Sequence, residues 1–311
     1  MSPTPIPEPL PQTLAHILAA LQATGLERLD AQLLLLHVLG QPPHQRGWLL
    51  AHDTDTLPPA LGNALTLLAQ RRLAGEPLAY LTGRKEFFGL DLAVDARVLV
   101  PRPDTETLVS WGIEILTDPN CTMATTSASG QGKANRSALD LGTGSGAIAL
   151  ALKASLPALQ VHAIDFSADA LAVAQANAQR LQLAVTFSQG AWFAGLADPS
   201  VKYDCIVSNP PYIAALDPHL AALTHEPLQA LASGADGLDD IRQIITQAPA
   251  HLKPGGWLLL EHGYDQAQTV RDLLTTAGFT QVQSRCDLAG IERCSGGQHN
   301  ATPADINCPR P

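Results

Sequence analysis

The sequence predicts an α/β protein with a doubly wound, mostly parallel sheet and a small helical bundle ahead of it. The sheet is predicted by segments of strand length that alternate with helical segments from residue 138 onward. The bundle is predicted by apolar residues before residue 83, which recur at the three- and four-residue spacing of helices. A chain of 311 residues has room for two such domains.

The first part of the chain predicts a helical domain over residues 12–82. Helical spacing begins at Gln12, continues over residues 29–39 and resumes from Pro58, a residue type that suits a first helical turn. Residues 1–11 contain five prolines and predict a flexible tail. Three or more helices over about 70 residues predict a small bundle.

A connector and a second domain follow the bundle. Residues 83–103 are predicted to form a β-hairpin connector, because two short apolar segments flank a glycine turn. The second domain is expected over residues 104–295. Within it, residues 119–137 are rich in Ser, Thr, Gly and Ala and predict a flexible loop. The polar residues 296–311 predict a disordered tail.

A glycine-rich turn, Gly142-Thr143-Gly144-Ser145-Gly146, follows the first predicted strand of the second domain. Residues without Cβ let the backbone approach a ligand closely, and ligands of parallel sheets bind at the carboxyl ends of the strands. Asp165 ends the next strand and could accept hydrogen bonds from both ribose hydroxyls of a nucleoside. The turn also fits a dinucleotide fingerprint, so adenosylmethionine and nicotinamide cofactors both remain open.

The motif Asn209-Pro210-Pro211-Tyr212 follows the fourth predicted strand. An amide nitrogen is a poor nucleophile, so a site that methylates it needs oxygen acceptors that hold its NH₂ group. The Asn209 side chain and the Pro210 carbonyl are the predicted acceptors, and two consecutive prolines make that backbone rigid. The Tyr212 ring could pack on a planar amide. These residues predict amide or amine methylation.

Composition excludes several classes of protein. The formal net charge of −10 disfavours nucleic-acid binding, which usually needs a basic surface. Five cysteines without a C-x-x-C pair argue against disulfides or a zinc site, so no metal is expected. The N-terminus lacks a signal-peptide pattern, and the apolar runs are too short to span a membrane. We therefore expect a cytoplasmic protein, and a monomer.

The order of the motifs resembles the release factor glutamine N5-methyltransferases, the PrmC/HemK family. The resemblance runs from Leu14 to Glu292 and rests on these segments: Glu86-Phe87-Phe88-Gly89, Val100-Pro101-Arg102-Pro103-Asp104-Thr105-Glu106, the glycine turn after Asp140-Leu141, Asn209-Pro210-Pro211-Tyr212-Ile213, and Leu260-Glu261-His262-Gly263. It implies the Rossmann-like fold of class I enzymes that depend on S-adenosyl-L-methionine (SAM).

The same resemblance implies an activity and its site. SAM would donate a methyl group to the side-chain nitrogen of the glutamine in the Gly-Gly-Gln (GGQ) loop of release factors, modulating translation termination and leaving S-adenosyl-L-homocysteine. The N-terminal bundle would contact that partner. The implied cofactor residues are Gly142, Thr143, Gly144, Ser145, Gly146, Asp165, Trp192 and Asn209. The implied substrate residues are Asn209, Pro210, Pro211, Tyr212, Arg102 and Glu106, with Asn209, Pro210 and Tyr212 in the catalytic role.

Three alternatives remain at this point. An adenine methyltransferase would use the same motif on a flipped base, a non-catalytic protein could hold SAM and a partner, and a nicotinamide dehydrogenase could use the glycine turn. The chain also contains Gly296-Gly297-Gln298, which raises the hypothesis that the protein methylates itself. Its position in the predicted tail favours a coincidence.

Overall fold

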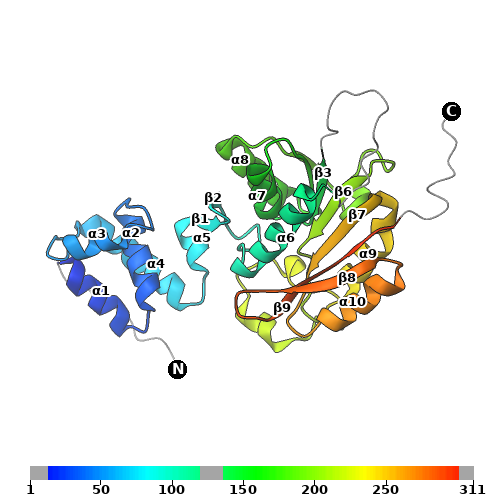
Figure 1. Cartoon of the computed structure of the whole chain (residues 1–311). Coiled ribbons are helices and arrows are strands. Elements are labelled where there is room, and N and C mark those ends of the chain that lie inside the picture. The colour runs from blue at the N-terminus through cyan, green and yellow to red at the C-terminus, as the bar shows by residue number, and fades with distance from the viewer. Residues whose placement is uncertain (1–12, 120–135, 301–311) are drawn as a thin grey trace. The chain divides into compact units, whose positions relative to one another are not determined.

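The computed structural model describes residues 13–119 and 136–300. The predicted tail at 1–11, most of the predicted loop at 119–137, and residues 301–311 lie outside this description. The chain forms two compact units that divide between Arg84 and Lys85 (Figure 1).

The first unit is helical, as predicted. Thr13 caps the first helix, because its hydroxyl accepts a hydrogen bond from the His16 amide. The apolar residues at three- and four-residue spacing form one buried cluster in which Leu21, Leu34 and Leu65 are fully buried. The helices are α1 (Leu14–Ala23), α2 (Arg28–Val38), α3 (Arg46–Ala51), α4 (Pro59–Leu73) and α5 (Leu78–Thr82).

The predicted hairpin consists of β1 (Arg84–Phe87) and β2 (Leu90–Ala93). Its second strand is fixed to helix α8 (Ala168–Leu181), because the Asn177 side chain accepts from the Ala93 amide and donates to the Ala93 carbonyl. The Asn177 amide group also donates to the Ser145 carbonyl in the glycine turn. The hairpin is therefore joined to the segment that the sequence singled out as a ligand site.

The second unit is built on a seven-stranded sheet with the order β5-β4-β3-β6-β7-β9-β8. Strands β3 to β7 are parallel, and β9 runs antiparallel between β7 and β8. The strands are β3 (Ser137–Leu141), β4 (Gln160–Asp165), β5 (Thr186–Gln189), β6 (Tyr203–Ser208), β7 (Leu252–Glu261), β8 (Thr280–Cys286) and β9 (Glu292–Gln298). The chain moves outward from β3 to β5 and returns at β6, so the topological switch point lies between β3 and β6.

Helices cover both faces of this sheet (Figure 1). On one face, Leu258 and Leu260 of β7 pack in a cluster with residues of α9 (Asp239–His251) and α10 (Ala267–Thr276). On the other face, Leu259 lies close to Gly112 of α6 (Glu106–Thr117), beside α7 (Ala147–Ser155). Successive residues of a strand point to opposite faces, so the apolar run in β7 fills both cores.

The prediction that a disordered tail begins at residue 296 is wrong, because Gly296, Gly297 and Gln298 belong to β9 and pair with β7. A Cβ atom on Gly296 would lie 2.6 Å from a Leu259 methyl carbon and 3.0 Å from the Trp111 ring. The glycines let the strand approach its neighbours closely, but they remove the alternating apolar pattern that would reveal a strand.

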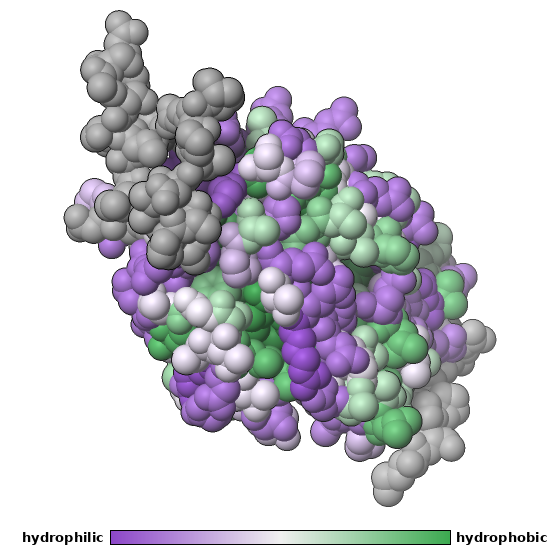
Figure 2. All heavy atoms as spheres, turned by 90° about the vertical axis from the view of Figure 1, so that its right-hand side faces the viewer, coloured by the Kyte–Doolittle hydropathy of each residue, from purple (hydrophilic) through white to green (hydrophobic). Residues whose placement is uncertain are grey.

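The surface of the second unit mixes hydrophilic and apolar side chains on the face shown in Figure 2. Scattered apolar residues of this kind are normal on a folded protein. Among the residues that the structure describes, no helix has the length and apolar character needed to cross a membrane.

Candidate active site

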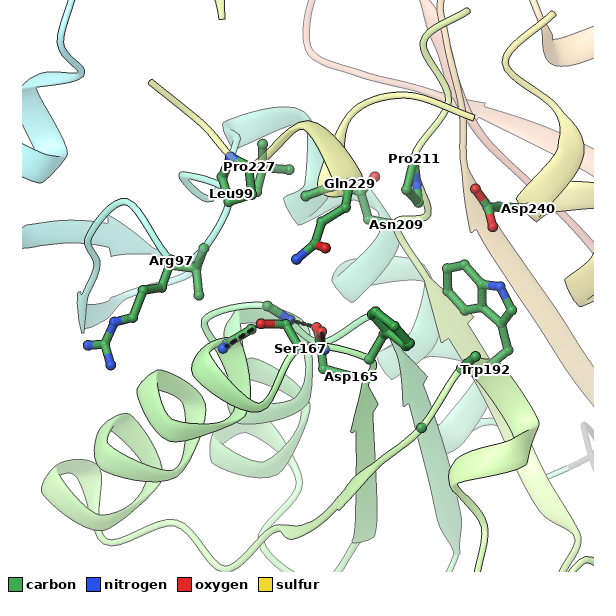
Figure 3. Close-up of a pocket in the computed structure, with 18 of the residues that line it drawn as sticks. Arg97, Leu99, Asp165, Ser167, Trp192, Asn209, Pro211, Pro227, Gln229 and Asp240 are labelled. Carbon is green, nitrogen blue, oxygen red and sulfur yellow. Dashed lines mark hydrogen bonds between the residues drawn. The ribbon is translucent and has the colours of Figure 1, made fainter. Parts of the chain in front are cut away.

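The motifs singled out in the sequence meet at a cavity of about 370 Å³ at the carboxyl ends of β3, β4 and β6 (Figure 3). This volume lies within the range of about 300–1,000 Å³ common for small-molecule sites. Asp165 and Ser167 form its floor, and Gln229 points into it from the opposite side. The predicted site residues that line it are Gly142, Gly144, Asp165, Trp192, Asn209 and Pro211.

The glycine turn has a conformation that other residues adopt with strain. Gly142, Gly144 and Gly146 have φ angles of 73°, 55° and 85°. A Cβ atom on Gly144 would meet no protein atom within 4 Å, so the backbone there is open to a ligand. The Thr143 hydroxyl donates to Asp140 at 2.6 Å, which holds the turn against the end of β3.

Asp165 links the turn to the floor of the cavity. Its two carboxylate oxygens accept hydrogen bonds from the Gly144 amide at 2.8 Å and the Ser167 amide at 2.9 Å. Burial raises the pKa of Asp165, and these backbone amides oppose that shift. A carboxylate has about four acceptor positions, so this side chain retains capacity for two hydroxyl groups of a ligand.

Asp140 is fully buried under the turn, and burial raises its pKa to about 7. One carboxylate oxygen accepts from Thr143 and from the Ala149 amide, whereas the other has no hydrogen-bond partner. A cationic ligand above the turn would stabilise the charged form of this carboxyl group.

Trp192 stands beside the turn and contributes an aromatic wall. It lies at the start of the short 3₁₀ turn η2 (Trp192–Gly195) and has a φ angle of 51°, which is uncommon for a bulky residue. A Cβ atom on Gly190 would lie 2.4 Å from Gly195, so only a residue without Cβ closes this loop. Strained backbone of this kind is concentrated at functional sites.

Asn209 lines the large cavity and also a smaller one of about 110 Å³ that contains Arg102 and Tyr212. The Asn209 side-chain nitrogen donates to the Thr105 hydroxyl at 3.2 Å, so the Asn209 side-chain oxygen faces away from Thr105. Within the described part of the chain, no hydrogen bond uses the carbonyl of Pro210. The unpaired Asn209 oxygen therefore belongs to a residue that lines both cavities, whereas Pro210 is buried and lines neither of them.

Tyr212 is partly buried, and its hydroxyl donates to the Glu261 carboxylate at 3.4 Å. Burial is the main reason that the pKa of Tyr212 is raised, so the phenol stays protonated. Burial also raises the pKa of Glu261 to about 7, and the hydroxyls of Thr105 and Tyr212 oppose this shift by hydrogen bonding. Glu261 is the last residue of β7 and contacts the corner through the Tyr212 hydroxyl.

The two remaining predicted residues, Arg102 and Glu106, occupy different positions. Arg102 lines the smaller cavity and forms an ion pair of 2.5 Å with the buried Glu226, which also accepts from the Val100 amide. Glu106 lines neither cavity and accepts instead from the Phe88 amide in the hairpin turn. The structure therefore brings Arg102 to the site and assigns Glu106 a contact with the hairpin.

Sequence reasoning missed several residues around the cavities. Glu226 and Gln229 come from the segment between β6 and α9, whereas Asp240 comes from α9. Thr105 and Glu261 lie inside the quoted segments 100–106 and 260–263, but no local pattern showed that they meet Asn209 and Tyr212. Each pair is separated by about 50–100 residues along the chain, which only the fold brings together.

Comparison with known proteins identifies the family. A family model described as "Methyltransferase small domain" matches residues 127–285, and one described as "PrmC N-terminal domain" matches residues 12–83. A release factor glutamine methyltransferase of Bordetella pertussis is 50% identical over 275 residues, which cover 88% of this chain and 95% of that protein. The chain belongs to the release factor glutamine methyltransferase family.

A second family member, from Burkholderia pseudomallei, is 44% identical and covers 94% of this chain and 98% of its own length. Among solved structures, the catalytic domain of hMettl16 in complex with MAT2A 3′UTR hairpin 6 aligns with a TM-score of 0.52 at 16% identity. That alignment covers 77% of this chain and 83% of the other, and at this identity it supports the fold alone. The chain is thus a methyltransferase with the class I Rossmann-like fold.

Metal ligation has no support in the described residues. Within residues 13–119 and 136–300, no group of three or more His, Cys, Asp or Glu side chains is placed to hold a metal ion. The hypothesis of self-methylation is also weakened, because the Gln298 side chain donates to the Gly255 carbonyl and accepts from Gln281 within the sheet.

Proposed function

We propose that this chain transfers a methyl group from SAM to the side-chain amide nitrogen of the glutamine in the GGQ loop of peptide chain release factors. The observation that carries the proposal is the position of Asn209, which lines both cavities with its oxygen unpaired and lies next to the free Pro210 carbonyl. The names of the relatives agree with this assignment.

The larger cavity is the proposed cofactor site. The open backbone at Gly144 would accept the methionine portion, and the Asp165 carboxylate would accept hydrogen bonds from both ribose hydroxyls. Trp192 would pack on the adenine ring, since it forms a wall of the same cavity. Thr143, Ser145 and Gly146 would complete the cofactor site as members of the same turn. SAM, when bound, supplies a methyl group already activated by its positive sulfonium.

The smaller cavity is the proposed glutamine site. The side-chain oxygen of Asn209 and the carbonyl oxygen of Pro210 would accept hydrogen bonds from the two N–H groups of the target amide. This contact holds the nitrogen in line with the methyl group and opposes the delocalisation of its lone pair. The dipoles of both oxygens also stabilise the positive charge that develops on nitrogen. The methylated nitrogen becomes acidic, so its extra proton is lost to solvent.

The remaining proposals concern substrate contacts and organisation. Tyr212 and Pro211 would pack on the amide plane, and Arg102 would contact the substrate from the wall of the smaller cavity. Glu106 would act through the hairpin that it holds. Residues 12–82 would recognise the release factor. We also propose that the protein is a cytoplasmic monomer that binds neither DNA nor a metal ion.

The test is methylation of purified release factor with isotopically labelled SAM, followed by peptide mapping. We expect one methyl group on the side-chain nitrogen of the GGQ glutamine and none on a release factor in which that glutamine is replaced by alanine. A label on DNA or RNA offered in the same reaction, with no label on the release factor, would overturn the assignment.

A further inference from the structure

One segment between β6 and α9 contributes to the walls of both cavities. Residues 213–233, here called the strap, begin directly after Tyr212. The strap is closed at its base, because the Ile213 amide donates to the Leu231 carbonyl and the Ser233 amide donates to the Ile213 carbonyl, both at 2.9 Å. The strap residues that line the larger cavity are Pro227, Gln229 and Ala230, and those that line the smaller one are Leu223, Ala230 and Leu231.

A second segment, residues 97–102, completes the same wall. Residues 97–99 line the larger cavity, and Leu99 and Arg102 line the smaller one. Figure 3 shows Leu99 and Pro227 close together on one side of the larger cavity. The two cavities therefore share a wall that is built from two segments far apart in the chain.

Glu226 of the strap joins these two segments with both of its carboxylate oxygens. Oε2 accepts from the Val100 amide at 3.1 Å, and Oε1 accepts from the Arg102 guanidinium at 2.5 Å. The Glu226 side chain is 3% exposed, so both contacts lie where little water competes with them. Glu226 itself lines neither cavity, so it acts on a ligand only through the residues that it holds.

We propose that Glu226 is a positioning residue, which holds the strap against residues 97–102 and thereby fixes the wall that the cofactor and the substrate share. The inference rests on the proposed function, which assigns the larger cavity to SAM and the smaller one to the target glutamine. When the strap is held, both ligands meet a preformed wall. When it is released, each ligand must first order the wall, which lowers its apparent affinity.

The chemistry of this link requires an acceptor with two oxygens. The Val100 amide and the Arg102 guanidinium are both donors, and neither can accept a hydrogen bond from the residue at position 226. Glutamine has nearly the same shape as glutamate but only one oxygen, so its NH₂ group would face one of the two donors. Glu226→Gln therefore removes one of the two contacts and changes the packing little.

The same argument predicts that a second substitution repairs the first. In the double variant Arg102→Met with Glu226→Gln, the glutamine oxygen can accept from the Val100 amide, and its NH₂ group no longer faces a donor. Arg102→Met alone leaves the buried carboxylate without its cation, which is more costly than the absence of both partners. The two substitutions should therefore be strongly non-additive.

The first experiment measures the binding of S-adenosyl-L-homocysteine by calorimetry, with full-length protein. Its sulfur is uncharged, so its affinity reports on the wall and not on repulsion between Arg102 and a sulfonium. Glu226→Gln should weaken binding about 5–30-fold, and the double variant should bind within about threefold of the wild type. The matched control is Glu114→Gln, which breaks a 2.7 Å ion pair with Arg285 outside both cavities and should leave the affinity unchanged.

The second experiment separates KM from kcat, with labelled SAM and release factor. Glu226→Gln should raise the KM for release factor about 5–30-fold, whereas kcat at saturation should stay within about threefold, because Asn209 is untouched. A purely structural role would lower the unfolding temperature and leave both the ligand affinity and the KM at wild-type values. That result, or a fall in kcat alone, would overturn the proposal.

A third readout uses the wild-type protein and needs no variant to fold. A ligand that binds only when the strap is held must oppose its release. At about ten times its Kd, S-adenosyl-L-homocysteine should therefore slow hydrogen exchange of the Val100 amide about tenfold. An exchange rate that the ligand does not change would contradict the positioning role.

The outcomes for the two proposals are separate. If the predicted changes in S-adenosyl-L-homocysteine binding are found but no methyl group reaches the release factor, the proposed function fails and the positioning role of Glu226 stands. If the release factor is methylated and Glu226→Gln binds S-adenosyl-L-homocysteine as tightly as the wild type, the positioning role fails alone.

Discussion

The two halves of the active site are supported in different ways. The glycine turn is held by residues from the same third of the second unit: Asp140 binds Thr143, and Asp165, 21 residues further along the chain, binds Gly144. The Asn209 corner is held by residues far away in the chain. Its side chain is bound by Thr105, and the Tyr212 hydroxyl is bound by Glu261.

The two halves of the active site therefore depend on different parts of the fold. The turn is built within one strand–turn–helix unit and the next strand, so it forms wherever the sheet forms. The corner needs the 3₁₀ turn at Pro103–Thr105, β6 and β7 to be placed correctly at the same time. We therefore expect changes at the turn to alter ligand affinity, and changes around the corner to alter the rate of the chemical step.

The largest effect is expected for Asn209→Ala. Loss of one of two acceptors at the reacting nitrogen should lower kcat about 10²–10³-fold, by analogy with the removal of one oxyanion donor. SAM affinity measured by calorimetry should change little, because the turn is intact. A kcat within about tenfold of the wild type, with normal thermal unfolding, would contradict the role given to this corner.

Asp165→Ala should produce the opposite pattern. Two hydrogen bonds from hydroxyl groups to a charged acceptor would be lost, which should weaken SAM binding about 10–100-fold. At saturating SAM, kcat should stay close to the wild-type value. The control is Asp169→Ala, an exposed carboxylate in the first turn of the neighbouring helix α8. An equal loss of SAM affinity in the two variants would show that only the local negative charge, and not hydrogen bonding by Asp165, determines SAM binding.

The pH dependence of stability tests the burial of Glu261. Its pKa is raised from 4.5 to about 7, so the folded protein binds more protons than the unfolded chain between these values. Stability from this group is therefore lost as pH rises through that window. The free energy of unfolding of Glu261→Gln, relative to the wild type, should increase by about 2–3 kcal/mol between about pH 5 and about pH 8. Urea unfolding at both pH values measures it, and a constant difference would contradict the burial.

A smaller effect, on stability, is expected where β9 packs beside β7. Gly296→Ala places a Cβ atom 2.6 Å from Leu259 and 2.7 Å from the Leu258 carbonyl, so it should destabilise the protein by about 1–3 kcal/mol. Gly62→Ala, in helix α4 with no atom within 4 Å of the added Cβ, should be neutral or stabilising. Urea unfolding compares the two, and equal midpoints would mean that β9 adapts to the added methyl group.

The same contrast explains what could be predicted from the sequence. The doubly wound sheet, the helical first unit and the glycine turn follow from local periodicity and turn chemistry, and the structure has all three. The contacts of Thr105, Glu226 and Glu261 could not be predicted, because no local pattern encodes a partner about 50–130 residues away. Strand β9 was missed for another reason: Gly296 and Gly297 are buried without side chains, so their burial leaves no apolar signal.

The central claim is that Asn209 and Pro210 present two oxygens to the target amide beside the cofactor cavity. A crystal structure with S-adenosyl-L-homocysteine and a peptide carrying the GGQ sequence tests it most directly. We predict the glutamine nitrogen within hydrogen-bonding distance of the Asn209 side-chain oxygen and the Pro210 carbonyl, facing the sulfur. A glutamine bound outside this corner, or an Asn209 that turns its NH₂ group toward the substrate, would contradict it.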